Sequence, residues 1–120
     1  MRIRSVVGLI LATSIVAGCS VQLHTAAAAS ETCDLALIAG SLEKHPQTGL
    51  GIGTGGEQVT PVQWPFGYSA RMDLSGVVLV DETGKVIAKE HDRVEAGGGS
   101  GAEGVWIACG PVSTVSNEGG

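Results

Sequence analysis

The sequence is poor in aromatic and charged residues, and both shortages exclude some classes of protein. Aromatic side chains make up 3% of the 120 residues, charged side chains make up 16%, and the formal net charge is −5. A nucleic-acid-binding protein needs a basic face to neutralise phosphates, which this composition does not supply. We therefore expect no nucleic-acid partner. The length allows one small domain at most.

Long apolar runs are missing as well. No run reaches the roughly 18 to 20 residues that a membrane-spanning helix needs. The N-terminal segment 1–18 has the shorter layout of a secretory signal peptide: a basic start (MRIR), an apolar stretch over residues 5–15, and small residues that lead to Cys19. We expect this segment to direct export.

The four residues 16–19 (VAGC) resemble the lipobox of bacterial lipoproteins. The resemblance implies cleavage before Cys19 and acylation of its thiol with diacylglycerol, to which a palmitate-type amide chain can be added. Two or more acyl chains hold a protein stably to a bilayer, whereas one chain does so only marginally. The alternative is an ordinary signal peptide that is cut elsewhere, for instance near the alanines at 26–29.

Cleavage before Cys19 would leave an acidic protein. Loss of Arg2 and Arg4 lowers the basic count from seven to five, against twelve acidic side chains. Anionic headgroups repel such a domain, so we expect the acyl chains to hold it to the bilayer. The predicted location is the extracytoplasmic side of a bacterial membrane, in the cell envelope, with the functional surface turned outward.

The remainder of the chain divides into three parts by composition. Residues 19–32, the lipidated cysteine and an alanine-rich stretch, predict a flexible tether, because they offer no apolar face to bury. Residues 33–112 predict the folded domain, and residues 113–120 predict a disordered tail. His24 lies in the tether and is expected to be solvated.

The folded part predicts an all-β domain. The clearest signal is a hairpin, in which two apolar β-branched runs flank the turn Asp81-Glu82-Thr83-Gly84. Further strands are expected over 34–39, 59–64, 93–96 and 105–109. The glycine-rich stretch 49–56 predicts a loop or a strand with side chains on one face, and the glycines at 97–99 predict a strand end. Five or six short strands indicate a small barrel or a folded antiparallel sheet.

Two cysteines remain if Cys19 is acylated. In an exported protein, Cys33 and Cys109 favour a disulfide that joins the two ends of the β-region. Such a bond matters because the core contains few aromatic side chains. A pair of redox-active or metal-binding thiols is the alternative, which the absence of a CxxC spacing disfavours.

The sequence contains no pattern that predicts an enzyme or a bound cofactor. There is no glycine-lysine phosphate loop and no Gly-x-Ser-x-Gly motif, and few aromatic side chains are available to enclose a substrate. A metal site is the alternative, built from His45 and His91 with the neighbouring carboxylates Glu43, Glu90 and Asp92, if the fold brings them together. Solvated turn residues explain the same pattern.

The candidate binding surface is the aromatic segment 62–71. It holds Trp64, Phe66 and Tyr68 beside Arg71, and these residue types dominate interface energetics. The same aromatics could instead fill a thin core around the bend at Pro65. We expect Trp64 in the core and Tyr68 and Arg71 at the surface. The partner would be another envelope protein or a small ligand.

Three ordered pieces of the chain resemble a group of small, functionally uncharacterised bacterial secreted proteins and lipoproteins. These pieces are WPFGYSAR at 64–71, GVVLVDETGKVIAKEHDRVEAGGG at 76–99, and WIACG at 106–110. The resemblance covers roughly residues 33–110 and implies a small OB-like β-barrel with no assigned activity. His91 stands where that group would have a turn glycine, which raises the question of whether the turn keeps a positive φ.

Overall fold

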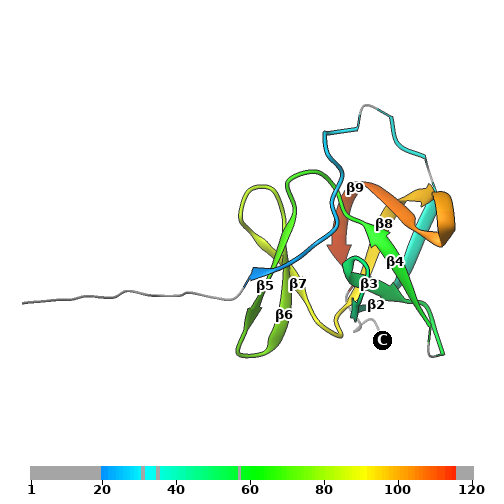
Figure 1. Cartoon of the computed structure of the whole chain (residues 1–120). Helices are drawn as coiled ribbons and strands as arrows, with labels where there is room; N and C mark the ends of the chain where they lie inside the picture. The colour runs from blue at the N-terminus through cyan, green and yellow to red at the C-terminus, as the bar shows by residue number, and fades with distance from the viewer. Residues whose placement is uncertain (1–19, 31, 35, 57, 116–120) are drawn as a thin grey trace, which may run out of the picture.

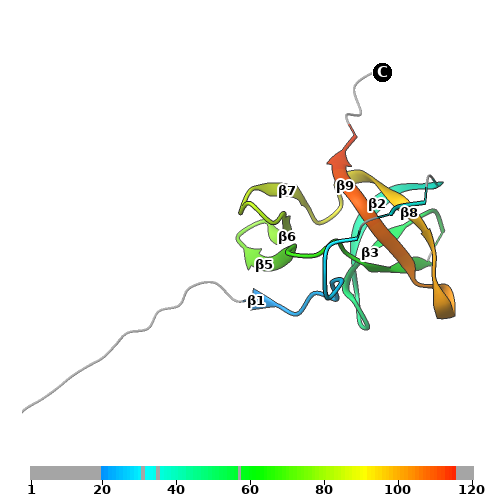
Figure 2. The same cartoon turned by 90° about the horizontal axis from the view of Figure 1, so that it is seen from above.

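Two β-sheets make up the structure, a computed structural model that describes residues 20–115 apart from 31, 35 and 57 (Figures 1 and 2). The larger sheet closes into a five-stranded barrel. Neighbouring barrel strands are antiparallel, except that β4 and β9 run parallel. In spatial order the barrel strands are β2 (Ala36–His45), β3 (Gly49–Gly53), β4 (Val59–Gln63), β9 (Trp106–Thr114) and β8 (Arg93–Ser100). This arrangement confirms the expected all-β fold with an OB-like barrel.

The second sheet lies on one side of the barrel (Figure 2), and three of its four strands come from the connection between β4 and β8. It contains the predicted hairpin, in which Val80 pairs with Val86 next to the turn. Five or six strands in one small barrel or one folded sheet are the prediction, whereas the described residues form nine strands in two sheets, and this hairpin belongs to the second sheet. Its strands in spatial order are β1 (Ser20–Val21), β5 (Ser69–Asp73), β6 (Gly76–Val80) and β7 (Val86–Lys89).

The glycine-rich stretches are barrel strands. In β3, Leu50 and Ile52 are buried, whereas the alternate positions are glycine, as expected for side chains on one face only. The prediction that glycines 97–99 end a strand is wrong, because β8 continues to Ser100. A Cβ atom at Gly98 would overlap the carbonyl oxygen of Ile107 in β9, so close strand approach requires glycine there.

The stretch predicted to be a free tether packs on the domain. Ser20 pairs with Arg71, and the amide of His24 donates to the carbonyl of Thr48 at 3.1 Å. Thr25 forms a bridge to Trp64, and the Ala26 amide donates to the Trp64 carbonyl at 2.9 Å. Residues 20–26 are therefore part of the folded structure and not a free tether, because their backbone groups find partners on the sheets.

The end of the domain also differs from the prediction. Strand β9 runs to Thr114, and the amide of Val115 donates to the Arg93 carbonyl at 2.8 Å, so residues 113–115 are ordered. Residues 116–120 of the predicted tail lie outside the described residues, as does the predicted signal peptide with Cys19. Within the described part of the chain, no helix has the length and apolarity to cross a membrane.

One hydrophobic core joins the two sheets. It combines inward side chains of the barrel, such as Leu42 and Val62, with Val77 and Leu79 from the second sheet, and Trp64 is fully buried among them. The predicted disulfide is present: Cys33 and Cys109 are bonded, with Cα atoms 5.5 Å apart and 76 positions of separation along the chain. It ties the segment before β2 to β9.

Candidate functional site

The aromatic segment divides between the core and the surface. Trp64 has 0% exposure and its indole N–H donates to the Leu50 carbonyl at 2.9 Å, so it is structural, as expected, and contributes nothing to a binding surface. Phe66 is 52% exposed. Tyr68 was expected at the surface, but it is nearly buried and its hydroxyl oxygen accepts from the Val112 amide at 3.4 Å.

Phe66 and Tyr68 line an open groove of about 520 Å³. Its walls come from the N-terminal segment, the end of β4 and the bend after it, the turn between β6 and β7 with the start of β7, and strand β9. We call this the aromatic groove. Its lining residues are Ala26, Ala28, Ala29, Ser30, Gln63, Pro65, Phe66, Tyr68, Asp81, Glu82, Ile87, Ile107, Ala108, Cys109, Gly110, Pro111 and Val112.

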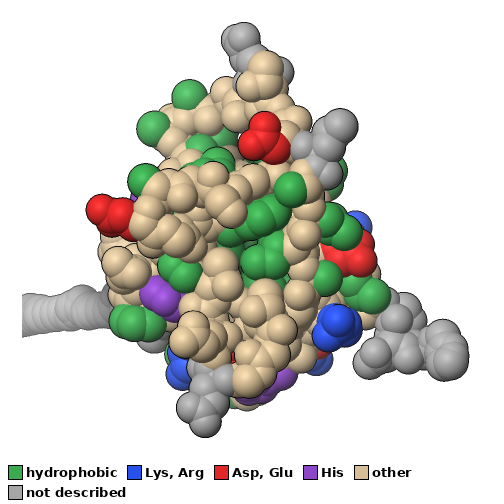
Figure 3. Space-filling view, turned by 90° about the vertical axis from the view of Figure 1, so that its right-hand side faces the viewer, with side chains coloured by type: hydrophobic (Ala, Val, Ile, Leu, Met, Phe, Trp, Pro, Cys, Tyr) green, Lys and Arg blue, Asp and Glu red, His purple; other side chains and the backbone are tan. Residues whose placement is uncertain are grey.

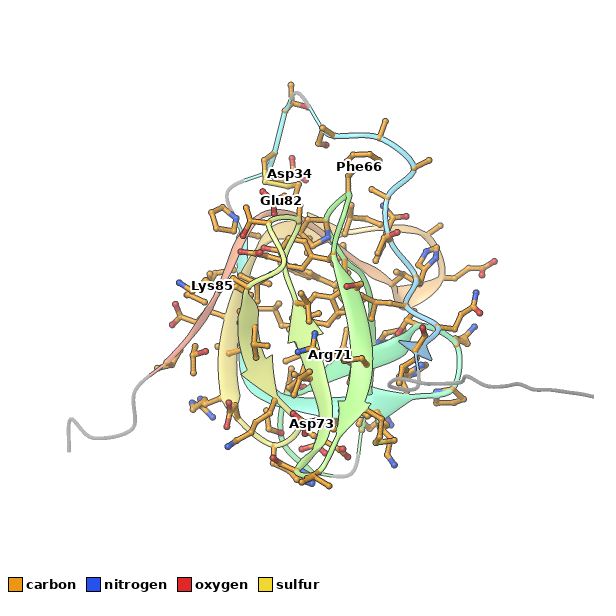
Figure 4. All side chains as sticks on the ribbon, turned by 90° about the vertical axis from the view of Figure 1, so that its left-hand side faces the viewer. Asp34, Phe66, Arg71, Asp73, Glu82 and Lys85 are labelled. Atoms are coloured by element: carbon orange, nitrogen blue, oxygen red, sulfur yellow. A yellow bond between two sulfur atoms is a disulfide. The ribbon has the colours of Figure 1, made fainter. Side chains whose placement is uncertain are left out.

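The bend that carries Phe66 packs closely against the turn between β6 and β7, which carries Glu82. Gly67 has a φ of 87°, and a Cβ atom at this position would lie 2.8 Å from the Cβ of Glu82. The bend can therefore approach the β6–β7 turn only because residue 67 is glycine. In Figure 4, Phe66 and Glu82 lie at the same end of the second sheet.

The carboxylates Asp81 and Glu82 make the groove acidic. Oδ1 of Asp81 accepts from the Thr83 hydroxyl at 2.7 Å and from the amides of Thr83 and Lys85 at 2.9 and 3.0 Å. These hydrogen bonds hold the pKa of Asp81 below its usual range, and the bond from the Thr83 hydroxyl has the largest effect. Asp81 is therefore ionised at neutral pH. The Glu82 side chain is exposed, and none of the described lining residues is basic.

Burial raises the pKa of the Tyr68 phenol above its ordinary value of about 10. The hydrogen bond from Val112 lowers this pKa, whereas the negative charges of Glu82 and Asp81 raise it further. Tyr68 is therefore a neutral phenol at neutral pH. Arg71, the fourth residue of the predicted surface, lies on the exposed outer face of the second sheet and does not line the groove (Figure 4).

A second cluster of polar side chains joins β2 to the turn after β7. Nδ1 of His91 lies 3.2 Å from Oε1 of Glu43, and its Nε2 lies 3.8 Å from Oε2 of Glu90. The three side chains place potential metal-ligand atoms within 4.8 Å of one another. We call Glu43, Glu90 and His91 the histidine cluster. His45 is not part of it, and Nδ1 of His45 accepts from the Gln47 amide at 3.1 Å, so the predicted His45–His91 combination is not formed.

The backbone explains how His91 reaches Glu43. The His91 amide donates to the Leu42 carbonyl at 2.7 Å, and the Leu42 amide donates to the Asp92 carbonyl at 2.8 Å. These two bonds hold the turn against β2. His91 has a φ of 76°, so the turn keeps the positive φ for which glycine is usual, and histidine tolerates it better than most residues.

Charged side chains are sparse on the face of the molecule shown in Figure 3. They lie around the rim of this face, while its centre is hydrophobic side chains and backbone. A basic patch is not visible there, in line with the acidic composition. No family model, curated protein sequence or solved structure matches the chain.

Proposed function

We propose that this protein is a bacterial lipoprotein whose small β-domain binds a ligand in the aromatic groove on the extracytoplasmic side of the membrane. The groove carries the proposal, because an open apolar hollow of about 520 Å³ with a few convergent polar groups is the usual form of a small-molecule site. Among the described lining residues, no nucleophile is hydrogen-bonded to a base, and the role proposed here is binding.

The chemistry of the groove defines a class of ligand. Alanine, proline and isoleucine side chains and the exposed ring of Phe66 favour an apolar body. Asp81 and Glu82 favour a cationic or hydrogen-bond-donating group at one end, where the described lining has no basic side chain and Lys85 lies outside the lining near Asp81. The proposed ligand is therefore a small molecule, or an extended peptide side chain, with an apolar part and a positive charge.

The lipid anchor rests on the sequence of residues 16–19 (VAGC) and on the cysteine count. The Cys33–Cys109 disulfide supports export, because disulfides persist in oxidising compartments outside the cytoplasm. Acylation of Cys19 would use the third cysteine and leave no unpaired thiol. The expected partners are the bilayer, through acylated Cys19, and the groove ligand.

Native mass spectrometry of protein extracted gently from host membranes tests the groove. We expect a mass excess beyond the lipid, and we expect the double variant Phe66→Ala/Glu82→Gln to lose it. Leu37→Ala/Glu103→Gln also truncates one exposed apolar side chain and neutralises one exposed carboxylate, both outside the groove, and should retain the mass excess. An excess retained by both double variants, or absent from the wild-type protein, would contradict binding in this groove.

The second candidate function is metal binding by the histidine cluster. Two carboxylates and an imidazole within 4.8 Å form a ligand set that suits Zn²⁺, with further positions open to water. Equilibrium dialysis against Zn²⁺ should give binding that His91→Ala abolishes. His45→Ala, the matched control outside the cluster, should bind like the wild-type protein. Equal binding by all three proteins would remove this candidate.

A further inference from the structure

We infer that the tip of the β5–β6 hairpin, with Met72 and Leu74, inserts into the surface of the bilayer that holds the lipid on Cys19. This inference rests on the lipid anchor proposed above and adds a protein contact to it. Leu74 is completely exposed, with 106% relative accessibility, and Met72 is 42% exposed. A leucine and a methionine exposed at a turn are apolar surface that only an apolar surrounding would cover.

The register of β1 and β5 brings the anchor to this tip. Strand β1 begins at Ser20, which is the residue after Cys19, so the two Cα atoms are about 3.8 Å apart. Ser20 pairs with Arg71, and Val21 pairs with Ala70, antiparallel. From Val21 back to Ser20, the chain therefore runs in the direction in which β5 approaches Leu74. Figure 1 shows β1 beside β5 on the side of the molecule away from the barrel.

The distances place the tip at membrane depth. Acyl chains on Cys19 bring Ser20 to the level of the headgroups, which form a layer about 5 to 8 Å thick on each side of the hydrocarbon. Leu74 lies three residues beyond Arg71, two of them along β5 and one into the turn, so it reaches up to about 10 Å beyond Arg71. The tip can therefore pass through the headgroups and bring Leu74 to the edge of the hydrocarbon.

The charges near the tip favour a bilayer surface of neutral headgroups. Asp73 lies within the tip, its Oδ1 accepts from the Ser75 amide at 2.8 Å, and Glu90 lies against Gly76. Arg71 and Lys89 lie on the same sheet, one row further from the tip. Two carboxylates and two cations leave no net positive charge that would attract anionic lipid, so the inferred partner is a zwitterionic lipid surface.

This orientation turns the aromatic groove away from the membrane. Because β5 and β6 are antiparallel, Tyr68 and Asp81 lie at the end of the hairpin opposite Leu74. In Figure 4, Phe66 and Glu82 lie at the top of the second sheet and Asp73 lies at the bottom. A domain docked by the tip would therefore present the groove to the periplasmic or external solution.

Tryptophan fluorescence of the acylated protein in phosphatidylcholine vesicles tests the docking. Leu74→Trp changes a fully exposed side chain, so the fold should be retained. Lys85→Trp is the matched control, since Lys85 is exposed beside the opposite turn (Figure 4). After subtraction of the wild-type spectrum, the tryptophan at 74 should emit at shorter wavelength and be quenched by lipids brominated on their acyl chains. The tryptophan at 85 should show neither effect.

The intact mass of the same preparation distinguishes a failure of the docking from a failure of the lipid anchor. An acylated protein in which the tryptophan at 74 behaves like the one at 85 would overturn the docking and leave the anchor standing. A blue shift of the tryptophan at 74 without quenching by brominated lipid would indicate contact between two copies of the chain. This result would also overturn the docking. A mass without lipid would overturn the anchor and, with it, this inference.

Discussion

Trp64 and Phe66 are two residues apart in the chain and serve different parts of the molecule. Trp64 fills the core between the two sheets and satisfies its indole N–H with the Leu50 carbonyl. Phe66 follows the bend at Pro65 and leaves half of its ring in the groove. The bend thus separates an aromatic side chain that stabilises the fold from one that is available to a ligand.

Truncating each of these aromatic side chains should separate the two roles. Trp64→Ala removes the largest buried side chain and should lower the free energy of unfolding by about 3 to 5 kcal/mol. Phe66→Ala removes a half-exposed ring and should cost about 1 kcal/mol or less, since the ring is not fully desolvated. Urea unfolding followed by circular dichroism measures both values. Similar costs for the two variants would contradict the assignment of Phe66 to the groove.

Tyr68 provides a pH signal at the groove, because it is the only tyrosine in the sequence. Its pKa in the folded protein is raised by burial, so the phenol should ionise at higher pH in the folded than in the unfolded protein. A raised pKa means that the stability from the neutral phenol is complete below about pH 10 and is lost as the pH rises through the folded value.

Spectrophotometric titration of the phenolate measures this shift directly. The midpoint in the native protein should lie above the midpoint in concentrated guanidinium. Phe66→Ala, which opens the groove next to Tyr68, should move the native midpoint toward the unfolded one. Equal midpoints in native and unfolded wild-type protein would contradict the burial of Tyr68.

At the scale of the elements, strand β8 shows why a small barrel needs glycine. Gly97 and Gly98 are neighbours, but a Cβ atom at Gly98 would overlap the Ile107 carbonyl oxygen, whereas one at Gly97 would come no nearer than 3.9 Å to the Ala36 carbonyl oxygen. The register between β8 and β9 shifts at this point, between Ala96 and Gly98. A bulge with close backbone contact therefore bends the two strands around the barrel.

Gly98→Ala should lower the free energy of unfolding by about 1 to 3 kcal/mol, the usual cost of forcing extra volume into packed structure. The neighbouring control, Gly97→Ala, has room for a methyl group and an ordinary φ, so it should be neutral or slightly stabilising. Thermal unfolding of the two variants and the wild-type protein compares these effects. A loss of stability in Gly97→Ala equal to that in Gly98→Ala would contradict the described register.

The strands differ in how far the sequence predicts them, for physical reasons. The β6–β7 hairpin is predictable because its strands are joined by the local turn signal at 81–84. The pairing of β1 with β5 is not, because Val21 and Ala70 are distant in the chain and two residues carry no periodicity. The strand at 93–100 is predicted to end too early, because glycine usually marks the end of a strand. Here the close approach of β9 requires glycine inside the strand.

The residues of the candidate site also differ in how far the sequence predicts them. Phe66 is predictable as a possible surface residue, since it belongs to the aromatic cluster at 64–68, whereas the burial of Tyr68 is not predicted. Their partners Asp81 and Glu82 look like ordinary turn residues, and the alanines at 26–29 look like a tether. Only the three-dimensional contacts between the bend, the turn and the N-terminal segment join them into one groove. No local pattern carries that information.

At the scale of the whole molecule, the disulfide and the shared core hold a small and aromatic-poor domain together. Cys33 and Cys109 close a loop of 76 positions, which the chain-entropy model values at about 4.5 kcal/mol. Cys33→Ala/Cys109→Ala should lower the free energy of unfolding by about that amount, or leave the chain unfolded at 37 °C. Urea unfolding compares this variant with the oxidised wild-type protein. Retention of full stability would show that the sheets alone suffice.

The molecule has two ends with different chemistry. One end carries the N-terminal entry of β1 beside the exposed Leu74, and the other end carries the acidic aromatic groove. The proposed anchor would hold the first end at the membrane, and the proposed ligand site at the second end would then face the surrounding solution.

The intact mass of the protein, extracted from the membranes of its host and kept non-reduced, tests this account most directly. The account predicts a chain that begins at Cys19, carries a diacylglycerol, and is two hydrogens lighter than the reduced form because of the Cys33–Cys109 bond. A chain that begins elsewhere and carries no lipid would contradict the membrane anchor and the orientation that follows from it.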